Sequence, residues 1–127
     1  MQLFVYGSLK SGGKYHCYLE EASLVSEHAS VNGVLYDSGL GYPAFVMSET
    51  EIVKGELYEI PEQLWPALDD LEGYAGEAAT DLFDKTTILV EANGEKVEAV
   101  IYVANDPQLL KTKISSDTWD AAQSLHA

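Results

Sequence analysis

The chain has 127 residues, of which 46% are hydrophobic and 22% charged, proportions typical of one soluble globular domain. Seven Lys and Arg residues face 21 Asp and Glu residues, and the resulting formal charge of −14 argues against nucleic acids, anionic membranes and acidic substrates as partners. The single cysteine, Cys17, excludes an intramolecular disulfide, a CxxC redox pair and a multi-thiolate zinc site.

The sequence also predicts where the protein resides. No apolar run approaches the roughly 20 residues that span a bilayer. The start, MQLFVYG, has neither a basic segment nor a small-residue cleavage site. We therefore expect a mature cytoplasmic protein. The oligomeric state does not follow from the sequence, and a monomer is the default expectation.

The first predicted element is a buried strand at the N-terminus. The apolar run Leu3-Phe4-Val5 begins at once and stops at Gly7, which is typical of a strand in the middle of a sheet. A short amphipathic helix is expected next, on the stripe Tyr15, Tyr18, Leu19 and Ala22. Cys17 on this helix is expected to be a small buried residue.

Short strands and one helix are predicted in the middle of the chain. The strands are expected where Val, Leu, Tyr and Ile lie between turn-forming residues, at 23–29, 31–37 and 52–59, with a turn-rich stretch at 37–43. Leu64, Leu68 and Leu71 then have helical spacing. Because proline is poorly tolerated inside a helix, we expect a turn at 61–65 and a helix that begins near Pro66 and ends at Gly73.

The clearest local prediction is a β-hairpin. Residues 86–91 and 96–103 are rich in strand-forming residues and flank Asn93-Gly94. After Pro107 we expect one helical turn, then a terminal helix capped by Ser115 or Ser116, with Trp119 and Ala122 facing inward. Many short strands without regular βαβ alternation predict a single α+β domain, residues 1–127, with a mostly antiparallel, barrel-like sheet.

The first segment that suggests chemistry follows the N-terminal strand. Residues 4–10 take a buried strand into Gly7-Ser8, where main-chain N–H groups can form an anion-binding nest. The alternative interpretation is a strand followed by an ordinary turn. Ser8 as a nucleophile is disfavoured, because the G-x-S-x-G elbow is absent and no motif links Ser8 to a histidine.

The second such segment, residues 68–74, contains a candidate acid/base. Leu68 and Leu71 mark the buried face of the predicted helix, and Glu72 follows at its end, beside the negative pole of the helix dipole. Burial and the dipole would both raise the pKa of Glu72, as general-base work near neutral pH requires. The alternative is that Glu72 is one more solvated carboxylate. Asp69 and Asp70 are both predicted to face solvent.

Other residue types give weaker signals. The chain lacks an HxxxH pair, a DxDxDG loop and a Cys/His pair at ligand spacing, so no metal site is predicted. The eight tyrosines are expected to be mostly half-buried strand residues. Four of them are candidates for lining a pocket with a hydroxyl group, namely Tyr6, Tyr42, Tyr74 and Tyr102.

In their order and spacing, these segments resemble the γ-glutamylcyclotransferase-like family, which includes γ-glutamylamine cyclotransferases. The resemblance covers most of the chain. Its motifs are the strand and loop Leu3 to Lys10, Gly41-Tyr42-Pro43-Ala44, Val53 to Tyr58, Leu68 to Tyr74, Val100 to Val103 and Ile114 to Trp119.

Membership would imply a small mixed β-barrel with short flanking helices. It would also imply a cofactor-independent intramolecular aminolysis, in which a γ-glutamyl amine or amino acid releases 5-oxoproline and a free amine. The family's catalytic acid/base maps onto Glu72, and its substrate-holding loop maps onto Tyr6, Gly7, Ser8 and Leu9. Main-chain amides of residues 7–9 would bind either the α-carboxylate or the oxyanion.

The segment after Tyr74 departs from the family pattern. A proline and a Y-x-R segment are expected there, whereas this chain has Phe83 and Lys85 in the aromatic and basic places. Lysine lacks the planar fork with which arginine grips a carboxylate. This departure keeps open a small-molecule-binding member of the fold without catalysis. A further alternative is a hydrolase or lyase on a related pocket, with Glu72 activating water.

Overall fold

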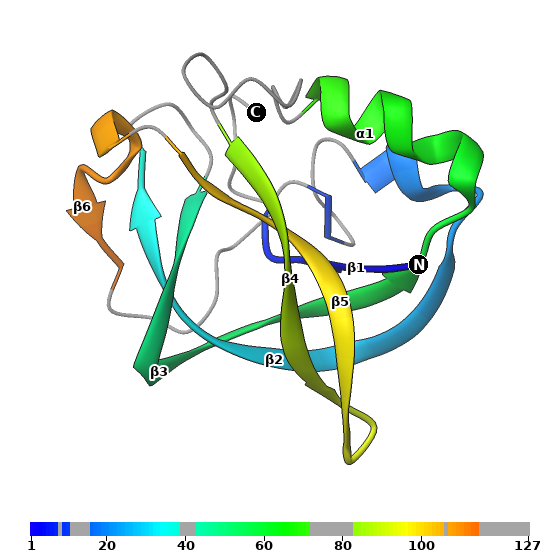
Figure 1. Cartoon of the computed structure of the whole chain (residues 1–127), viewed down its shortest axis with the longest axis horizontal. Coiled ribbons are helices and arrows are strands. Elements are labelled where there is room, and N and C mark those ends of the chain that lie inside the picture. The colour runs from blue at the N-terminus through cyan, green and yellow to red at the C-terminus, as the bar shows by residue number, and fades with distance from the viewer. Residues whose placement is uncertain (8, 11–15, 39–42, 72–82, 106, 115–127) are drawn as a thin grey trace.

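The computed structural model describes residues 1–7, 9–10, 16–38, 43–71, 83–105 and 107–114. Its main feature is a small mixed β-barrel of five strands with one short α-helix beside it (Figure 1). The barrel strands are β1 (Gln2–Val5), β2 (Ser23–Asp37), β3 (Pro43–Glu59), β4 (Phe83–Ala92) and β5 (Glu95–Ala104). They run in the order β3-β1-β5-β4-β2, and β2 pairs with β3 to close the barrel. The predicted α+β fold with a mostly antiparallel barrel is confirmed.

The N-terminal strand β1 lies inside the sheet, as its apolar run predicts. It pairs antiparallel with β3 and parallel with β5, where Leu3 is opposite Val100. Leu3, Phe4 and Val5 are all buried, because a central strand is covered on both faces. β1 therefore has a neighbouring strand on each side, and its pairing with β3 continues to Val5, two residues before Gly7.

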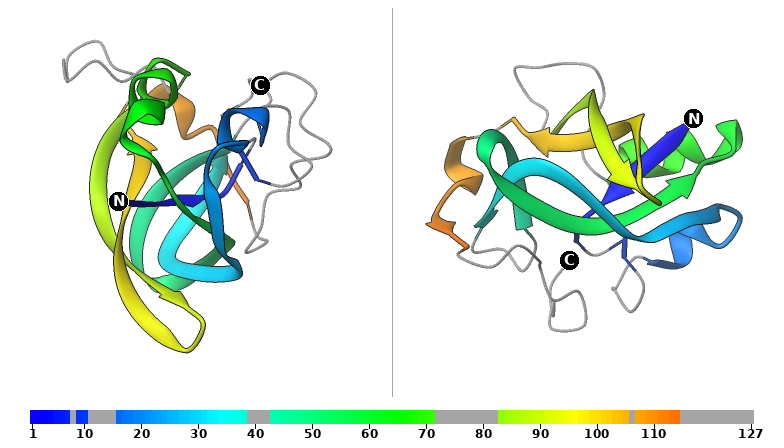
Figure 2. Two further views of the ribbon diagram at one scale, coloured as in Figure 1. Left: turned by 90° about the vertical axis from the view of Figure 1, so that its right-hand side faces the viewer. Right: turned by 90° about the horizontal axis from the view of Figure 1, so that it is seen from below.

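The strands β2 and β3 are much longer than predicted. Residues 23–29 and 31–37 form one strand, and β3 begins at Pro43 instead of residue 52. The register shifts at three places in β2, one of them Asn32/Gly33, and it is continuous from Ala29 to Val31, where the prediction separated the two strands. Bulges let a long strand bend without ending, and both strands curve around the barrel in Figure 2.

The predicted helix at 15–22 is largely absent from the described residues. Only a 3-10 turn, η1 (His16–Leu19), is formed, and Leu19 is its buried residue. Cys17 is exposed, so its predicted burial is wrong. A single turn directs few side chains toward the core, and in η1 the side chain that points to the core is that of Leu19.

The helix α1 (Trp65–Leu71) follows the 3-10 turn η2 (Glu62–Leu64), and this order confirms the prediction of a turn and then a helix near Pro66. Leu68 is fully buried and belongs to a cluster that includes Leu3, Val5, Val100 and Tyr102. A second cluster, around Phe4, Tyr6 and Phe45, receives the alternate residues of the same strands. Because neighbouring strand residues point to opposite faces, β1 and β5 separate the two clusters.

The predicted hairpin is confirmed. Its strands β4 and β5 are joined at Asn93 and Gly94, whose φ angles of 55° and 78° are those of a two-residue hairpin turn. The predicted turn after Pro107 is the 3-10 turn η3 (Pro107–Leu109), and it leads into the short edge strand β6 (Thr112–Lys113). Gly73 and the predicted terminal helix lie outside the described residues. Within the described ranges, no helix has the length and apolarity needed to cross a bilayer.

Candidate active site

The loop that leaves β1 is fixed by contacts at three successive described positions. Gly7 packs against Pro43, and a Cβ atom at residue 7 would come within 2.9 Å of the proline Cγ. The Gly7 carbonyl accepts a hydrogen bond of 3.0 Å from the Lys10 N–H, which closes a turn. Leu9 is buried. A side chain at position 7 would require Pro43 to shift, so this part of the predicted substrate-binding loop packs closely against the start of β3.

His16 holds the same loop from η1. Its Nδ1 atom lies 2.9 Å from the Leu9 carbonyl oxygen, and because a carbonyl only accepts, Nδ1 is the donor. Its ring also lies near that of Tyr58, with centroids 6.0 Å apart. Sequence reasoning missed this residue, since a hydrogen bond to a main-chain carbonyl leaves no motif.

Four of the predicted site residues lie outside the described residues: Ser8, Tyr42, Glu72 and Tyr74. The position of Glu72 in the chain is nevertheless informative. Leu71 is the last described residue of α1, and Glu72 follows it directly in the sequence.

Tyr6 and Tyr102 lie close together and are joined by a hydrogen bond. The Tyr6 hydroxyl donates to the main-chain carbonyl of Tyr102 over 2.6 Å in a buried position. The Tyr102 hydroxyl in turn donates to Asp69 Oδ1, also over 2.6 Å. Both hydroxyl protons are therefore used inside the protein.

Asp69 is the centre of a polar cluster, which corrects the prediction that it faces solvent. Lys85 Nζ lies 3.1 Å from Oδ1 and 3.2 Å from Oδ2 of Asp69, and the side chains of both residues are only 24% exposed. The same ammonium group lies 4.6 Å from the centroid of the Trp65 ring, a cation–π distance. Asp69, Lys85, Tyr102 and Trp65 are called the Asp69 cluster below. Asp70 is exposed, as predicted.

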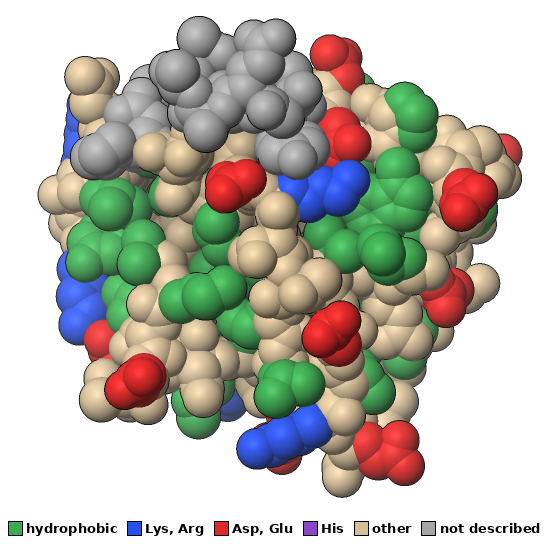
Figure 3. Space-filling model, in the orientation of Figure 1, with side chains coloured by type: hydrophobic (Ala, Val, Ile, Leu, Met, Phe, Trp, Pro, Cys, Tyr) green, Lys and Arg blue, Asp and Glu red, His purple; other side chains and the backbone are tan. Residues whose placement is uncertain are grey.

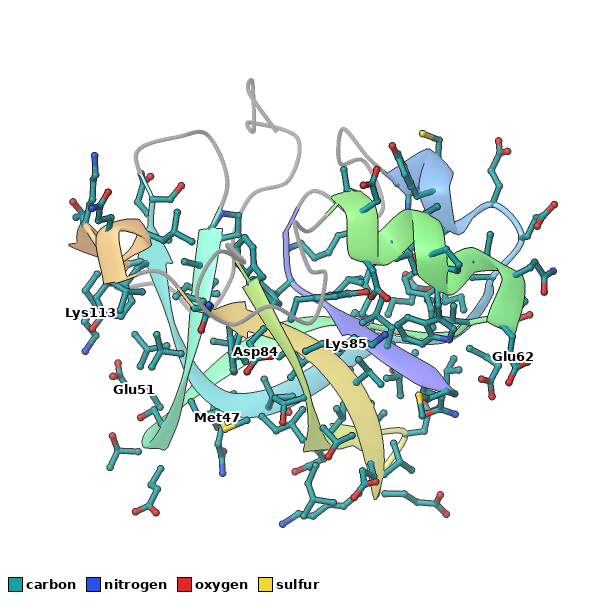
Figure 4. The ribbon with its side chains drawn as sticks, turned by 45° about the horizontal axis from the view of Figure 1, so that its top comes forward. Met47, Glu51, Glu62, Asp84, Lys85 and Lys113 are labelled. Atoms are coloured by element: carbon teal, nitrogen blue, oxygen red, sulfur yellow. The ribbon has the colours of Figure 1, made fainter. Side chains whose placement is uncertain are left out.

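Lys85 reaches this cluster from β4, and Figure 4 shows its side chain between β4 and α1. The departure from the family's arginine therefore leaves a carboxylate contact in place. A sequence signal for part of the cluster exists, because the Asn93-Gly94 turn fixes the hairpin register and makes Lys85 and Tyr102 direct cross-strand partners. Nothing in the sequence pattern indicates that Asp69 is the group they share.

A hollow of about 370 Å³ is lined by Lys10 and by residues of β2 and β3. Its charged lining has both signs, with Lys10 and Lys54 facing Glu27 and Glu56. This mixture selects no ligand charge. Across the described ranges, no three His, Cys, Asp or Glu side chains come together as a bound metal would require.

Comparisons with known proteins agree with this architecture. A family model described as "Gamma-glutamyl cyclotransferase, AIG2-like" matches residues 3–121. A "Gamma-L-glutamyl-butirosin B gamma-glutamyl cyclotransferase" of Niallia circulans is 39% identical over 126 residues, which are 98% of this chain and 79% of that protein.

Solved structures show the same fold. YkqA from Bacillus subtilis is 31% identical with a TM-score of 0.75 over 93% of this chain, and the match spans only 39% of the YkqA chain. A protein from Pyrococcus horikoshii has a TM-score of 0.67 at 18% identity, with 93% of this chain and 88% of that chain covered. On the family match and the 39% identity over nearly its whole length, this chain belongs to the AIG2-like γ-glutamyl cyclotransferase family.

Proposed function

We propose that the protein cyclises a γ-glutamyl amide to 5-oxoproline and releases the amine, with Glu72 as the acid/base and residues 6–9 as the substrate-holding loop. The observation that best supports this proposal is a shared contact. Tyr6, which directly follows β1, and Asp69, which lies in α1 three residues before Glu72, are both hydrogen-bonded to Tyr102 of β5.

The proposed reaction needs one proton carrier and no added reactant. A free α-amine is mostly protonated at pH 7 and must lose a proton before it attacks the γ-carbonyl carbon. That first proton goes to solvent. As the new C–N bond closes the ring, Glu72 takes a second proton from the attacking nitrogen, and it delivers this proton to the leaving nitrogen as the bond to the amine breaks. Because the attack is intramolecular, the protein's contribution is to fold the glutamyl chain into its reactive conformation.

The loop is proposed to hold one of the two anionic groups of the reaction, the α-carboxylate or the oxyanion, on the main-chain amides of Gly7, Ser8 and Leu9. The packing of Gly7 against Pro43 and the bond from His16 to Leu9 support a preformed loop. Tyr42 and Tyr74 are proposed to line the pocket. Tyr6 and Tyr102 donate their protons elsewhere, so toward substrate they are proposed to offer rings or acceptor oxygens.

We further propose that the amine half of the substrate is cationic. The charge of −14 attracts cations and repels the extra carboxylate of a γ-glutamyl amino acid. Acidic side chains are scattered over the face shown in Figure 3, whereas the basic ones lie at a few separate places. We expect kcat/KM to be on the order of tenfold higher for a γ-glutamyl diamine than for γ-glutamylalanine at low salt, and the gap to narrow in 0.5 M salt. Equal values that do not respond to salt would contradict this preference.

The decisive experiment compares Glu72→Gln with Asp70→Asn, a matched loss of one exposed carboxylate two residues away. We expect Glu72→Gln to lower kcat by about 10²- to 10⁴-fold and Asp70→Asn to leave it unchanged. Products are identified chromatographically, because cyclisation yields 5-oxoproline and hydrolysis yields glutamate. A folded Glu72→Gln variant with parental turnover would overturn the proposed mechanism. Ligand-induced thermal stabilisation without turnover would favour the non-catalytic alternative.

A further inference from the structure

Asp69 occupies a place in α1 that local forces disfavour. Aspartate is a poor helix former, and no basic residue lies in the last turn of Trp65–Leu71 to pair with it. Its stabilising contacts come from outside the helix, from Lys85 and Tyr102 on the β4–β5 hairpin.

These contacts determine how α1 is oriented on the barrel. Lys85 and Tyr102 are cross-strand partners, so both side chains extend from the same face of the hairpin. Trp65 and Asp69 are four residues apart and share one face of α1, and the Lys85 ammonium group contacts both. Two contacts on one helix face restrict rotation of α1 about its own axis.

Tyr102 extends the same set of contacts to the substrate loop. Its side chain binds Asp69, and its main-chain carbonyl accepts the Tyr6 hydroxyl. Tyr6 precedes Gly7 directly, and Asp69 precedes Glu72 by three residues. One residue of β5 is therefore linked to the segments that lead into both parts of the proposed active site.

We propose that the Asp69 cluster positions Glu72 relative to the loop at residues 7–9, with Lys85 and Tyr102 as positioning residues. This inference rests on the proposed cyclotransferase function. Without Lys85 or the Tyr102 hydroxyl, α1 keeps its buried anchor Leu68 but loses the contacts that fix its rotation. Small displacements of an acid/base lower the rate of the chemical step, and they affect substrate binding much less.

The test measures kcat and KM with a γ-glutamyl amine for four variants: Lys85→Met, Lys85→Arg, Tyr102→Phe and the distant control Lys113→Met. Lys85→Met is expected to lower kcat by about tenfold to hundredfold with KM changed less than threefold, and Tyr102→Phe by about threefold to tenfold. Lys85→Arg restores at least half of the parental kcat, because it keeps the charge and the donors. Lys113→Met leaves both constants unchanged.

If the Asp69 cluster had a purely structural role, its variants would lose activity only through unfolding. Assays run at least 15 °C below the Tm of each variant, with the folded fraction checked by circular dichroism, remove losses caused by unfolding. In addition, the Lys85→Met/Tyr102→Phe double variant loses less activity than the product of the single effects, because both residues act through Asp69. A kcat within twofold of parental for folded Lys85→Met, or strictly multiplicative losses, would overturn the inference.

A readout without turnover separates the inference from the proposed function. Hydrogen exchange is expected to accelerate in peptides covering residues 66–74 and 3–10 of Lys85→Met, with no change around β6. If Glu72→Gln abolishes turnover but Lys85→Met changes neither kcat nor exchange, the proposed function stands and the positioning role is wrong. If the parental protein forms no 5-oxoproline, both proposals fail.

Discussion

Lys85 and Lys113 each bind a carboxylate on another element of the chain, but the two ion pairs lie in different surroundings, at separate places in Figure 4. The Lys85–Asp69 side chains are 24% exposed, whereas those of Lys113 and Glu51 are 52% and 45% exposed. The exposed pair has the shorter separation, 2.8 Å against 3.1 Å. Distance is therefore a poor guide to importance, because water and salt screen the exposed pair and its side chains lose entropy when they pair.

The two regions also differ in what lies beneath them. Two residues of the Asp69 cluster, Trp65 and Asp69, lie on α1, whose Leu68 is fully buried. Both residues of β6 are exposed. An ion pair between rigid, buried elements fixes their relative position. The Lys113–Glu51 pair joins two exposed side chains, one of them on a two-residue edge strand, and therefore restricts the fold much less.

The largest expected effect tests this anchoring. Leu68→Ala should lower the free energy of unfolding by about 2–5 kcal/mol, because it removes a fully buried side chain and leaves a cavity under α1. Urea unfolding measures the change. Leu89→Ala is the matched control, since Leu89 is 62% exposed and its truncation should be nearly neutral. Equal losses for the two variants would show that α1 does not depend on this core.

The next effect concerns the half-buried ion pair. Lys85→Met should lower the free energy of unfolding by about 1–2 kcal/mol. Among the described residues, it would leave the Tyr102 hydroxyl as the remaining hydrogen-bond donor to the Asp69 carboxylate. Lys85→Arg should recover most of this loss. Chemical denaturation at pH 7 gives both values. If Lys85→Met were as stable as the parental protein, the Lys85 ion pair would contribute no more to stability than the exposed Lys113 pair.

A smaller effect is expected from the second donor to Asp69. Tyr102→Phe should cost about 1 kcal/mol, since the ring stays packed and one hydrogen bond to a charged group is lost. Combined with Lys85→Met, its effect should not be additive, because both groups serve the same carboxylate. Additive losses in a double-mutant cycle would mean that the two contacts act independently.

The smallest effect is expected at Lys113. The hydrogen bond and the charge of Glu51 raise the pKa of Lys113 above its ordinary 10.5. A lysine whose pKa is raised by folding stabilises the folded state below 10.5, and this contribution is lost as pH rises through the folded-state pKa. The Tm difference between the parental protein and Lys113→Met should therefore be barely detectable at pH 7 and absent at pH 12. A clear difference that persists at pH 12 would contradict this explanation.

The sequence predicted those features that local patterns specify. The run Leu3-Phe4-Val5 predicted a central strand, Asn93-Gly94 predicted the hairpin, and Pro66 with the leucine spacing predicted α1; all three are confirmed. The predictions at β2 and at η1 were less accurate. Residues 23–29 and 31–37 were predicted as two strands but form one, β2, whose register is continuous from Ala29 to Val31. An apparent helical stripe became one 3-10 turn with Cys17 exposed.

The composition and local order of the chain by themselves determined the fold class, the buried strand, the hairpin register and the family motifs. Only the tertiary structure decided the partners of Asp69 and the link between Tyr6 and Tyr102. The physical reason is that periodicity and turn chemistry act over a few neighbouring residues. An ion pair or a hydrogen bond between residues 16 to 96 positions apart depends on how the barrel closes.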